Sequence, residues 1–251
     1  MNYLLLGILQ GITEFLPVSS SGHLVIVQSL LGVGENVAFD TVLHLATALA
    51  LIIYFWYDLW SLLKKENWRL LGLLLLATAI TGVIGFAGKD FFESLFSSVQ
   101  AVGFFLLATG IFIMLGEWFG RGRRKLSGMT WRDAVFIGLA QGVAILPGIS
   151  RSGTTISASL GRDFEREAAA RFSFLLAIPA ILGAGLLQSK AIIKAGEIGI
   201  GFGPLLIGFL AAFVSGLLAI RFFMELVRRT SIRAFAYYCF AVGIAVIFFL
   251  R

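Results

Sequence analysis

Two stretches of the chain combine proline, glycine and hydroxyl side chains with groups that could handle a phosphate. Residues 10–23 read QGITEFLPVSSSGH, and residues 147–155 read PGISRSGTT. Glu14, His23 and Arg151 supply an acid, an imidazole and a guanidinium within otherwise apolar surroundings. Because ionisable groups are costly in an apolar environment, each of the three is a candidate functional residue.

The first stretch predicts a helix, a turn and the start of a second helix. Gln10 and Glu14 lie four residues apart and share one helix face. Pro17 ends that helix, and the hydroxyls of residues 19–21 precede a new helix that His23 opens. Amides and the helix dipole at such a start favour an anion. One serine is enough to cap a helix, so we favour anion binding over capping alone.

The second stretch predicts a similar turn that carries an arginine. Arg151 lies between Ser150 and Ser152 and is followed by Gly153, at the expected start of another helix. A guanidinium stays charged and binds phosphate oxygens in a bidentate manner. The alternative is a structural ion pair with Glu14, which adds little stability when buried and is compatible with a resting state of the same site.

The carboxylate and amide of this set predict a divalent cation. Glu14 and Gln10, facing an arginine, suit Mg²⁺ or Ca²⁺ bound jointly with a phosphate, because Mg²⁺ completes its shell with water and substrate oxygens. Zinc is disfavoured, since His23 is the only nitrogen ligand in the cluster. For His44, which lies inside an apolar run, a hydrogen bond to another helix is the favoured interpretation, and a role at the edge of the cavity is the less favoured one.

The elements that position these residues must be membrane helices. Of the 251 residues, 59% are hydrophobic and 14% are charged, and the mean hydropathy is +0.94. A soluble chain carries roughly 25% charged residues, so the composition excludes a soluble enzyme, a disordered chain and a disulfide-rich secreted module. The basic residues behind the net charge of +6 lie in loops and predict orientation rather than nucleic-acid binding.

Six apolar runs are long enough to cross a bilayer, which needs about 20 mostly apolar residues per helix. Two further regions, 1–31 and 130–160, have apolar arms of about 10–16 residues, which are short for a crossing and predict re-entrant hairpins. The six runs are Phe39–Tyr57, Leu70–Ala87, Val99–Trp118, Ala168–Leu187, Phe202–Met224 and Ala234–Leu250.

The two broken regions resemble each other, and each precedes three spanning runs. We therefore expect an all-α integral membrane protein with a single membrane domain, 1–251, made of two repeats, 1–120 and 128–251. An odd number of spans separates the hairpins, so the repeats are inverted and the hairpin tips meet near the midplane, where such proteins place ligand sites. A shift of 131 residues carries Gln10, Gly11, Ser19, Ser21 and Gly22 onto Gln141, Gly142, Ser150, Ser152 and Gly153.

Charge predicts the orientation of these elements. Fourteen of the 20 basic residues lie in four segments, 64–69, 121–132, 162–171 and 228–233, which an alternating topology places on one side. That side is expected to be cytoplasmic, so the first hairpin enters from outside and the second from the cytoplasm.

At these residues the sequence resembles the bacterial undecaprenyl pyrophosphate phosphatases, the membrane family linked to bacitracin resistance. The first motif of that family is an acidic residue or Gln, three residues, Glu, and then PVSSSGH or PVSSTGH, and the second is PGxSRSGxT. Both are present here, beginning at Gln10 and Pro147, and the resemblance covers nearly the whole chain. Many members have Glu where Gln10 stands, so a cation here would have one neutral ligand.

The resemblance implies removal of the terminal phosphate from undecaprenyl pyrophosphate (C55-PP), which recycles the carrier lipid for the cell wall. It implies a divalent cation, and a site open to the extracytoplasmic side of the bacterial cytoplasmic (inner) membrane. Carried over by position, the catalytic residues are Glu14, Ser20, His23 and Arg151. The phosphate-binding residues are Ser19, Ser21, Ser150, Arg151, Ser152, Gly153 and Thr155, and the metal ligands are Gln10 and Glu14.

The nucleophile and the function class each keep an alternative. Ser20 and His23 are three residues apart and face each other on a helix, so we expect a serine nucleophile activated by histidine. Attack by His23 itself is the other possibility. The rival function is a polyprenyl-phosphate flippase or anion transporter that uses the same midplane site. The expected partners are the C55-PP substrate and membrane lipids, without nucleic acid, and a homodimer is left open.

Overall fold

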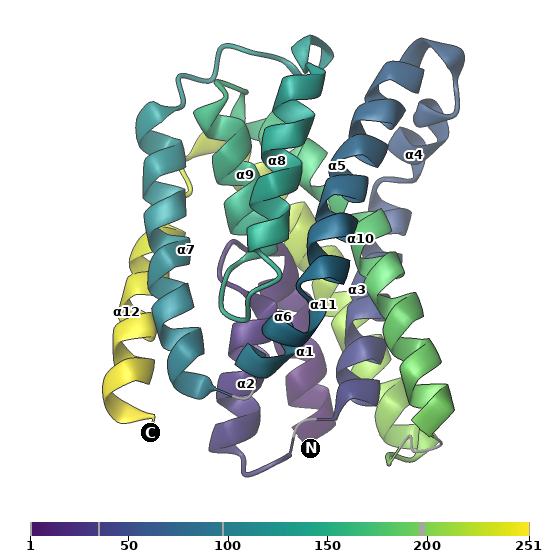
Figure 1. The fold of residues 1–251 in the computed structure, drawn as a ribbon, viewed down its shortest axis with the longest axis vertical. Coiled ribbons are helices and arrows are strands. Elements are labelled where there is room, and N and C mark those ends of the chain that lie inside the picture. The colour runs from purple at the N-terminus through teal and green to yellow at the C-terminus, as the bar shows by residue number, and fades with distance from the viewer. Residues whose placement is uncertain (1, 35, 97, 196–198, 251) are drawn as a thin grey trace.

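The computed structural model describes residues 2–34, 36–96, 98–195 and 199–250, which fold almost entirely into helices (Figure 1). The helices of the first half are α1 (Asn2–Phe15), α2 (Ser20–Leu30), α3 (Val37–Tyr54), α4 (Trp56–Leu62), α5 (Trp68–Ala87), α6 (Lys89–Phe96) and α7 (Val99–Phe119). Those of the second half are α8 (Trp131–Val143), α9 (Arg151–Gly161), α10 (Arg166–Ala195), α11 (Phe202–Arg229) and α12 (Arg233–Phe249). Short 3-10 turns cover Lys65–Asn67 and Leu126–Gly128.

Each of the six expected apolar runs forms a helix. Among the described residues, α3, α5, α7, α10 and α11 have the length and hydropathy of membrane spans, and α12 is a shorter apolar helix. The first run was expected to continue to Tyr57, but α3 ends at Tyr54 and the chain breaks at Phe55 before α4 begins. The chain is therefore built as a multi-pass, all-helical membrane protein.

The two broken regions form helix hairpins that lie at opposite ends of the molecule. In Figure 1, α1 and α2 occupy the lower half, whereas α8 and α9 occupy the upper half, and the turns between the paired helices lie in the middle. α1 ends two residues before Pro17, as expected from the clash of a proline ring with helical backbone. Gly148, in the second turn, has φ +95° and approaches α7 so closely that a Cβ would lie 2.6 Å from the carbonyl oxygen of Val102.

The two turns contact each other directly. The Ser152 hydroxyl donates to the carbonyl oxygen of Leu16 at 3.1 Å, which ties the second hairpin to the first. Thr109 of α7 holds the second turn from the side, because its hydroxyl donates to the carbonyl of Gly148 and accepts from the amide of Ser150, both at 3.0 Å. Residues far apart in the sequence thus meet at one buried point.

Small residues bring α1 close to α11. A Cβ on Gly7 would lie 2.5 Å from the carbonyl oxygen of Gly208, and one on Gly11 would lie 2.4 Å from that of Ala212. Close backbone approach through small residues spaced four apart is a typical way for membrane helices to pack. This contact holds the face of α1 that carries Gln10 and Glu14 in place.

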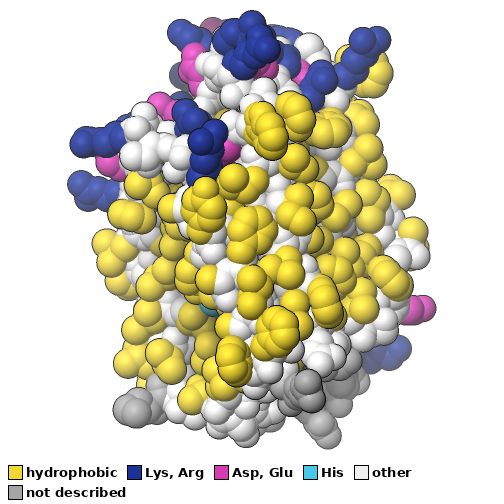
Figure 2. All heavy atoms as spheres, turned by 90° about the vertical axis from the view of Figure 1, so that its left-hand side faces the viewer, with side chains coloured by type: hydrophobic (Ala, Val, Ile, Leu, Met, Phe, Trp, Pro, Cys, Tyr) yellow, Lys and Arg dark blue, Asp and Glu magenta, His cyan; other side chains and the backbone are white. Residues whose placement is uncertain are grey.

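The outer surface has apolar sides and one strongly basic end. Figure 2 shows hydrophobic side chains over most of the visible face, with Lys and Arg gathered at one end. At that end Asp133, at the start of α8, binds Arg124 at 2.6 Å and Arg162 at 2.8 Å. Ion pairs between Arg166 and Glu117 at 2.7 Å and between Arg228 and Glu167 at 2.6 Å close the same end.

Candidate active site

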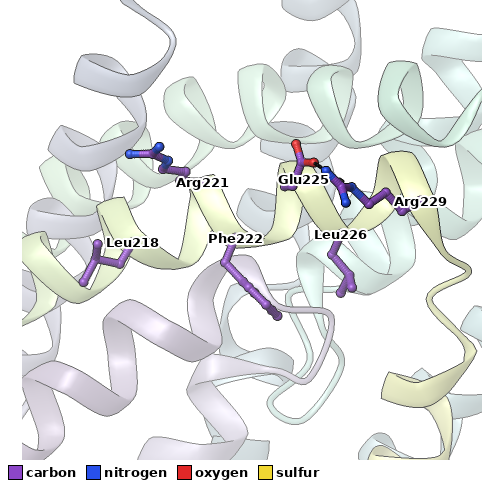
Figure 3. Close-up of a pocket in the computed structure, with 6 residues that line it drawn as sticks. All are labelled: Leu218, Arg221, Phe222, Glu225, Leu226 and Arg229. Carbon is purple, nitrogen blue, oxygen red and sulfur yellow. Dashed lines mark hydrogen bonds and ion pairs between the residues drawn. The ribbon is translucent and has the colours of Figure 1, made fainter.

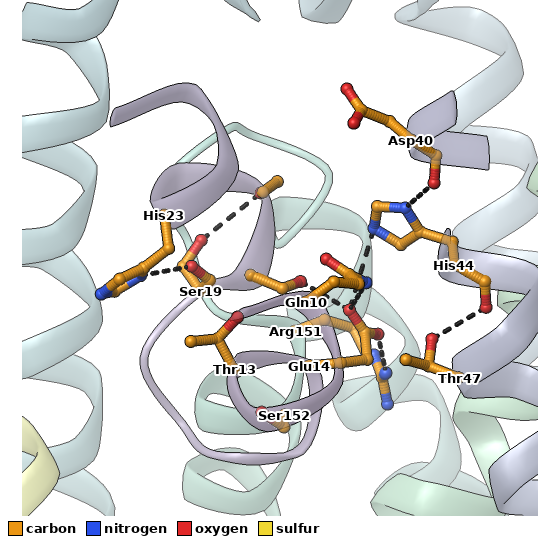
Figure 4. Close-up of polar contacts among 12 residues, drawn as sticks. Gln10, Thr13, Glu14, Ser19, His23, Asp40, His44, Thr47, Arg151 and Ser152 are labelled. Atoms are coloured by element: carbon orange, nitrogen blue, oxygen red, sulfur yellow. Dashed lines mark hydrogen bonds and ion pairs between the residues drawn. The ribbon is translucent and has the colours of Figure 1, made fainter. Parts of the chain in front are cut away.

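The carboxylate of Glu14 is the centre of the polar cluster between the hairpin turns (Figure 4). Its Oε1 contacts Nη2 of Arg151 at 2.6 Å. Its Oε2 accepts hydrogen bonds from the Ser20 hydroxyl at 2.5 Å and from the Gln10 amide at 3.0 Å. The structure therefore brings together four of the residues that the sequence singled out, and all four are mostly buried. The ion pair between Arg151 and Glu14, which the sequence offered as the alternative to phosphate binding, is present.

His23 is not paired with Ser20, in contrast to the expectation from their spacing. Its Nδ1 lies 2.8 Å from the carbonyl oxygen of Ser19, and its Nε2 lies 2.7 Å from the hydroxyl of Tyr238 on α12. The two rings are also stacked, with centroids 5.6 Å apart. Figure 4 shows the His23 ring directed away from Glu14. Both ring nitrogens are occupied, so the hydroxyl of Ser20 finds its acceptor on Glu14 instead.

The partners of His23 determine its protonation pattern. A carbonyl oxygen can only accept, so Nδ1 carries the hydrogen, and the neutral ring accepts at Nε2 from the Tyr238 hydroxyl. Sequence reasoning missed Tyr238, which is 215 residues away and looked like one more aromatic residue of a spanning helix.

The hydroxyls predicted to bind phosphate have partners within the turns, and their contact with a phosphate stays a prediction. Ser19 and Ser150 cap α2 and α9 by accepting from the amides of Gly22 at 3.3 Å and Gly153 at 3.1 Å, so the capping interpretation holds for both. The Ser21 hydroxyl lies 3.4 Å from that of Ser19.

Two more hydroxyls of the second hairpin also have structural partners. Ser152 contacts Leu16, as described above, and Ser150 at 3.2 Å. The Thr155 hydroxyl donates to the backbone carbonyl oxygen of Arg151 at 2.8 Å and lies 2.6 Å from the hydroxyl of Ser173. Ser173, like Thr109, carries no local signal in the sequence, because its role depends on packing between helices.

Two buried polar atoms at the cluster are left without partners among the described residues. They are Oε1 of Gln10, an acceptor, and Nη1 of Arg151, a donor. An unsatisfied buried polar group costs about 1–3 kcal/mol, so native structures rarely keep one without reason. These two atoms fit an anion that is bound together with a cation. The free acceptor of Gln10 could bind the cation, and the free donor of Arg151 could bind an anionic oxygen.

The donor set is suited to a cation that shares its ligands with a substrate. In the part of the chain that the structure describes, no three His, Cys, Asp or Glu side chains form a metal cage. Glu14 and Gln10 offer one carboxylate and one amide oxygen, the number of protein ligands that Mg²⁺ often takes before water and phosphate oxygens complete its shell.

His44 of α3 belongs to the same cluster, which agrees with the less favoured of the two sequence interpretations. Its Nε2 lies 3.8 Å from Oε2 of Glu14, and its Nδ1 bonds to the carbonyl oxygen of Asp40 within α3 at 2.8 Å. Figure 4 shows the His44 ring on the opposite side of Glu14 from His23. The expected hydrogen bond to another helix is replaced by this approach to the carboxylate.

Two surface grooves lie on the outer side of α11, away from Glu14. The first, of about 470 Å³, follows Leu218, Arg221, Phe222, Glu225, Leu226 and Arg229 along one face of the helix (Figure 3). The second, of about 830 Å³, lies between α1 and α11 and is lined almost wholly by apolar side chains, among them Ile8, Ile12 and Leu16. Neither groove is lined by Glu14, Arg151 or another residue of the polar cluster, which is mostly buried.

Comparison with known proteins places the chain among curated relatives over nearly its full length. Residues 3–245 match the sequence model of the family described as bacitracin resistance protein BacA. A protein of Halothermothrix orenii is 46% identical over 245 residues, which cover 96% of this chain and 95% of the relative. One of Carboxydothermus hydrogenoformans is 46% identical over 247 residues, covering 97% and 95%. One of Alkaliphilus metalliredigens is 42% identical over 266 residues, covering 98% and 97%. All three relatives are named undecaprenyl-diphosphatase.

Proposed function

Because the chain belongs to the bacitracin resistance protein BacA family, we propose that it hydrolyses C55-PP to undecaprenyl phosphate and inorganic phosphate. This activity recycles the carrier lipid of cell-wall synthesis and confers bacitracin resistance. The observation that carries the proposal is the pair of buried polar atoms left free beside Glu14. Arg151 bonds to Glu14 through Nη2 and keeps Nη1 as a free donor, and Gln10 bonds to Glu14 through its amide nitrogen and keeps Oε1 as a free acceptor.

We place this site in the bacterial cytoplasmic (inner) membrane, between two inverted repeats, 1–120 and 128–251. The contact between the two hairpin turns and the gathering of basic residues at one end support this arrangement. With the basic end in the cytoplasm, the first hairpin enters from the other side, so the site opens to the extracytoplasmic surface. The prenyl tail stays in the bilayer, and only the diphosphate enters between the turns.

Arg151 binds the diphosphate. Its Nη2 is held by Glu14 and its Nη1 is free to donate to a phosphate oxygen. The helix start that Ser150 caps adds backbone amides and a favourable dipole. Glu14 and Gln10 would hold Mg²⁺ or Ca²⁺, and the bound cation would neutralise charge on the diphosphate.

Ser20 is the proposed nucleophile, with Glu14 in place of His23 as the group that receives its proton. As the Ser20 oxygen bonds to the terminal phosphorus, the anhydride bond to undecaprenyl phosphate breaks. The hydroxyl proton passes through the carboxylate of Glu14, 2.5 Å away, to the departing phosphate or to water, which leaves Glu14 ionised again. Water then splits the phosphoserine, which releases inorganic phosphate and restores the serine hydroxyl. In the alternative, His23 attacks through Nε2, which first requires the Tyr238 hydroxyl to leave that nitrogen.

The direct test is phosphate release from C55-PP by the purified protein in detergent, with and without EDTA. We expect release that EDTA abolishes and Mg²⁺ or Ca²⁺ restores, and a large loss in a Glu14→Ala variant. A flippase or anion transporter would release no phosphate, so the absence of release from folded wild-type protein overturns the hydrolase proposal.

A second experiment decides the nucleophile. The phosphoenzyme is trapped with substrate labelled in the terminal phosphate and the labelled residue is located by peptide mapping. We expect acid-stable label on Ser20. Acid-labile label on His23 overturns the serine pathway and leaves the hydrolase proposal intact.

A further inference from the structure

His44 approaches Glu14 from a helix that neither motif contains. The α3 imidazole lies with Nε2 3.8 Å from Oε2 of Glu14, and its side chain is 31% exposed. This separation is too long for a hydrogen bond, so the two atoms face each other without a direct bond. Oε2 is the oxygen that also accepts from Gln10 and Ser20. The imidazole therefore reaches the oxygen around which the other donors gather.

The other ring nitrogen determines what Nε2 presents. Nδ1 bonds to the carbonyl oxygen of Asp40 at 2.8 Å, and because a carbonyl only accepts, the hydrogen is on Nδ1. In the neutral ring Nε2 then carries a lone pair directed at the carboxylate. Histidines that bind metals almost always donate their second N–H to a carbonyl or carboxylate in this way.

The distance between Nε2 of His44 and Oε2 of Glu14 suits one cation bound to both atoms. Bonds from a metal to nitrogen or oxygen are about 2.1 Å long, so one ion can bridge atoms up to about 4.2 Å apart. The gap of 3.8 Å between His44 and Glu14 lies within this range. Gln10 contacts the same carboxylate, and its Oε1 has no partner among the described residues. This oxygen can serve as the third ligand of the metal ion.

We propose that Nε2 of His44 is a ligand of the divalent cation, together with Glu14 and Gln10. This proposal rests on the proposed function only for the presence of a cation at the site. It changes the character of the site, because imidazole nitrogen suits first-row transition metals whereas Ca²⁺ takes oxygen ligands. The site therefore selects Mn²⁺ over Ca²⁺ more strongly than oxygen ligands alone allow.

The test uses Mn²⁺ as a spectroscopic probe on the full chain, purified without a polyhistidine tag. The chain has two histidines, so pulsed electron paramagnetic resonance can assign any nitrogen coupling to one of them. The probe is added alone and with inorganic pyrophosphate. We expect the coupling in the wild type and in His23→Gln, and its loss in His44→Gln.

Mn²⁺ and Ca²⁺ affinities are measured on the same preparations. Loss of His44 should weaken Mn²⁺ binding by about 10-fold or more. Removal of a residue that only hydrogen-bonds to a metal ligand already weakens metal binding by about 10–100-fold, and loss of a ligand should cost at least as much. Ca²⁺ binding should change less, because glutamine still offers an oxygen. His44→Asn serves as a second variant, and size-exclusion profiles and melting temperatures verify that each variant is folded.

The remaining outcomes separate this proposal from the hydrolase proposal. If wild-type protein releases phosphate with Mn²⁺ but shows no nitrogen coupling, or shows coupling that depends on His23, the role of His44 is overturned and the hydrolase proposal stands. Failure of Mn²⁺ to bind in either condition also overturns it. If no cation supports phosphate release, the proposed function itself fails.

Discussion

Arg151 and Glu14 are 137 residues apart in the chain, yet Nη2 of the first lies 2.6 Å from Oε1 of the second. Each residue lies in a different hairpin, so the pair exists only when the two turns meet. A buried ion pair is weak evidence for stability, since desolvation of both charges offsets their attraction. The free donor on Arg151 is better explained by an anion that the pair receives.

The geometry of Arg151 predicts that lysine cannot replace it. An ammonium can hold Glu14 or a phosphate oxygen, but it lacks the planar pair of donors that serves both. Arg151→Lys should lower kcat for phosphate release by about 10²–10³-fold, the loss typical of one transition-state donor. The matched control is Arg221→Lys on α11, whose guanidinium is exposed and has no assigned partner among the described residues. Near-normal turnover by Arg151→Lys or Arg151→Ala removes Arg151 from the site.

The contact between Tyr238 and His23 predicts a specific effect of one hydroxyl. Tyr238→Phe keeps the stacked ring and removes the donor to Nε2 of His23. In the serine pathway this bond positions His23 and the start of α2, which carries Ser20, so its loss should lower kcat by up to about 10-fold while KM changes little, because a hydrogen bond contributes about 0.5–1.5 kcal/mol. If His23 attacks instead, the variant should turn over at least as fast as the wild type, because Nε2 is freed. The neighbouring Tyr237 is 61% exposed, so Tyr237→Phe is the control. Equal activity of the two variants would show that this hydrogen bond plays no part in the reaction.

Asp133 predicts how stability depends on pH. Burial tends to raise the pKa of its carboxyl, but hydrogen bonds from Arg124, Thr130 and Arg162 outweigh burial and lower that pKa far below its ordinary value. A carboxyl whose pKa is lower in the folded than in the unfolded protein stabilises the folded state. This stabilisation is complete above the unfolded pKa of about 3.9 and is lost as the pH falls from there through the folded pKa. The melting temperature in detergent should therefore drop progressively below about pH 4.

The same measurement on variants assigns this acid sensitivity. Asp133→Asn should lower the melting temperature at pH 7 and flatten the acid limb, because hydrogen bonds to charged groups contribute about 1.5–3 kcal/mol. Asp58→Asn is the control, since its ion pair with Arg171 at 2.8 Å is partly exposed and worth at most about 1 kcal/mol. Asp58→Asn should keep the acid limb of the wild type. If Asp133→Asn keeps it as well, the stability argument for Asp133 is wrong.

The contact between α1 and α11 predicts that an added methyl group is costly. A Cβ on Gly11 would lie 2.4 Å from the carbonyl oxygen of Ala212, so the helices must separate. Gly11→Ala should reduce stability by about 1–3 kcal/mol, as overpacking does, and should also lower activity because Gln10 and Glu14 shift with α1. Gly72→Ala, where a Cβ meets nothing within 4 Å, is the control for thermal melting and phosphate release. An unchanged melting temperature in Gly11→Ala contradicts the packing argument.

The sequence by itself determined the helices, the two interrupted hairpins and the residues of the two motifs. These follow from local properties, namely apolar length, the break at Pro17 and the four-residue spacing of Gln10 and Glu14. A bilayer leaves few other conformations to such segments, because each must satisfy its own backbone hydrogen bonds.

Only the tertiary structure decided which side chains meet. In the structure Ser20 bonds to Glu14 rather than to His23, and His23 bonds to Tyr238. His44 lies beside the carboxylate of Glu14. These contacts depend on how α2, α3 and α12 pack and rotate against one another, and several partners are separated by most of the chain. Spacing along one helix shows which side chains share a face, whereas the packing of the other helices determines what that face meets.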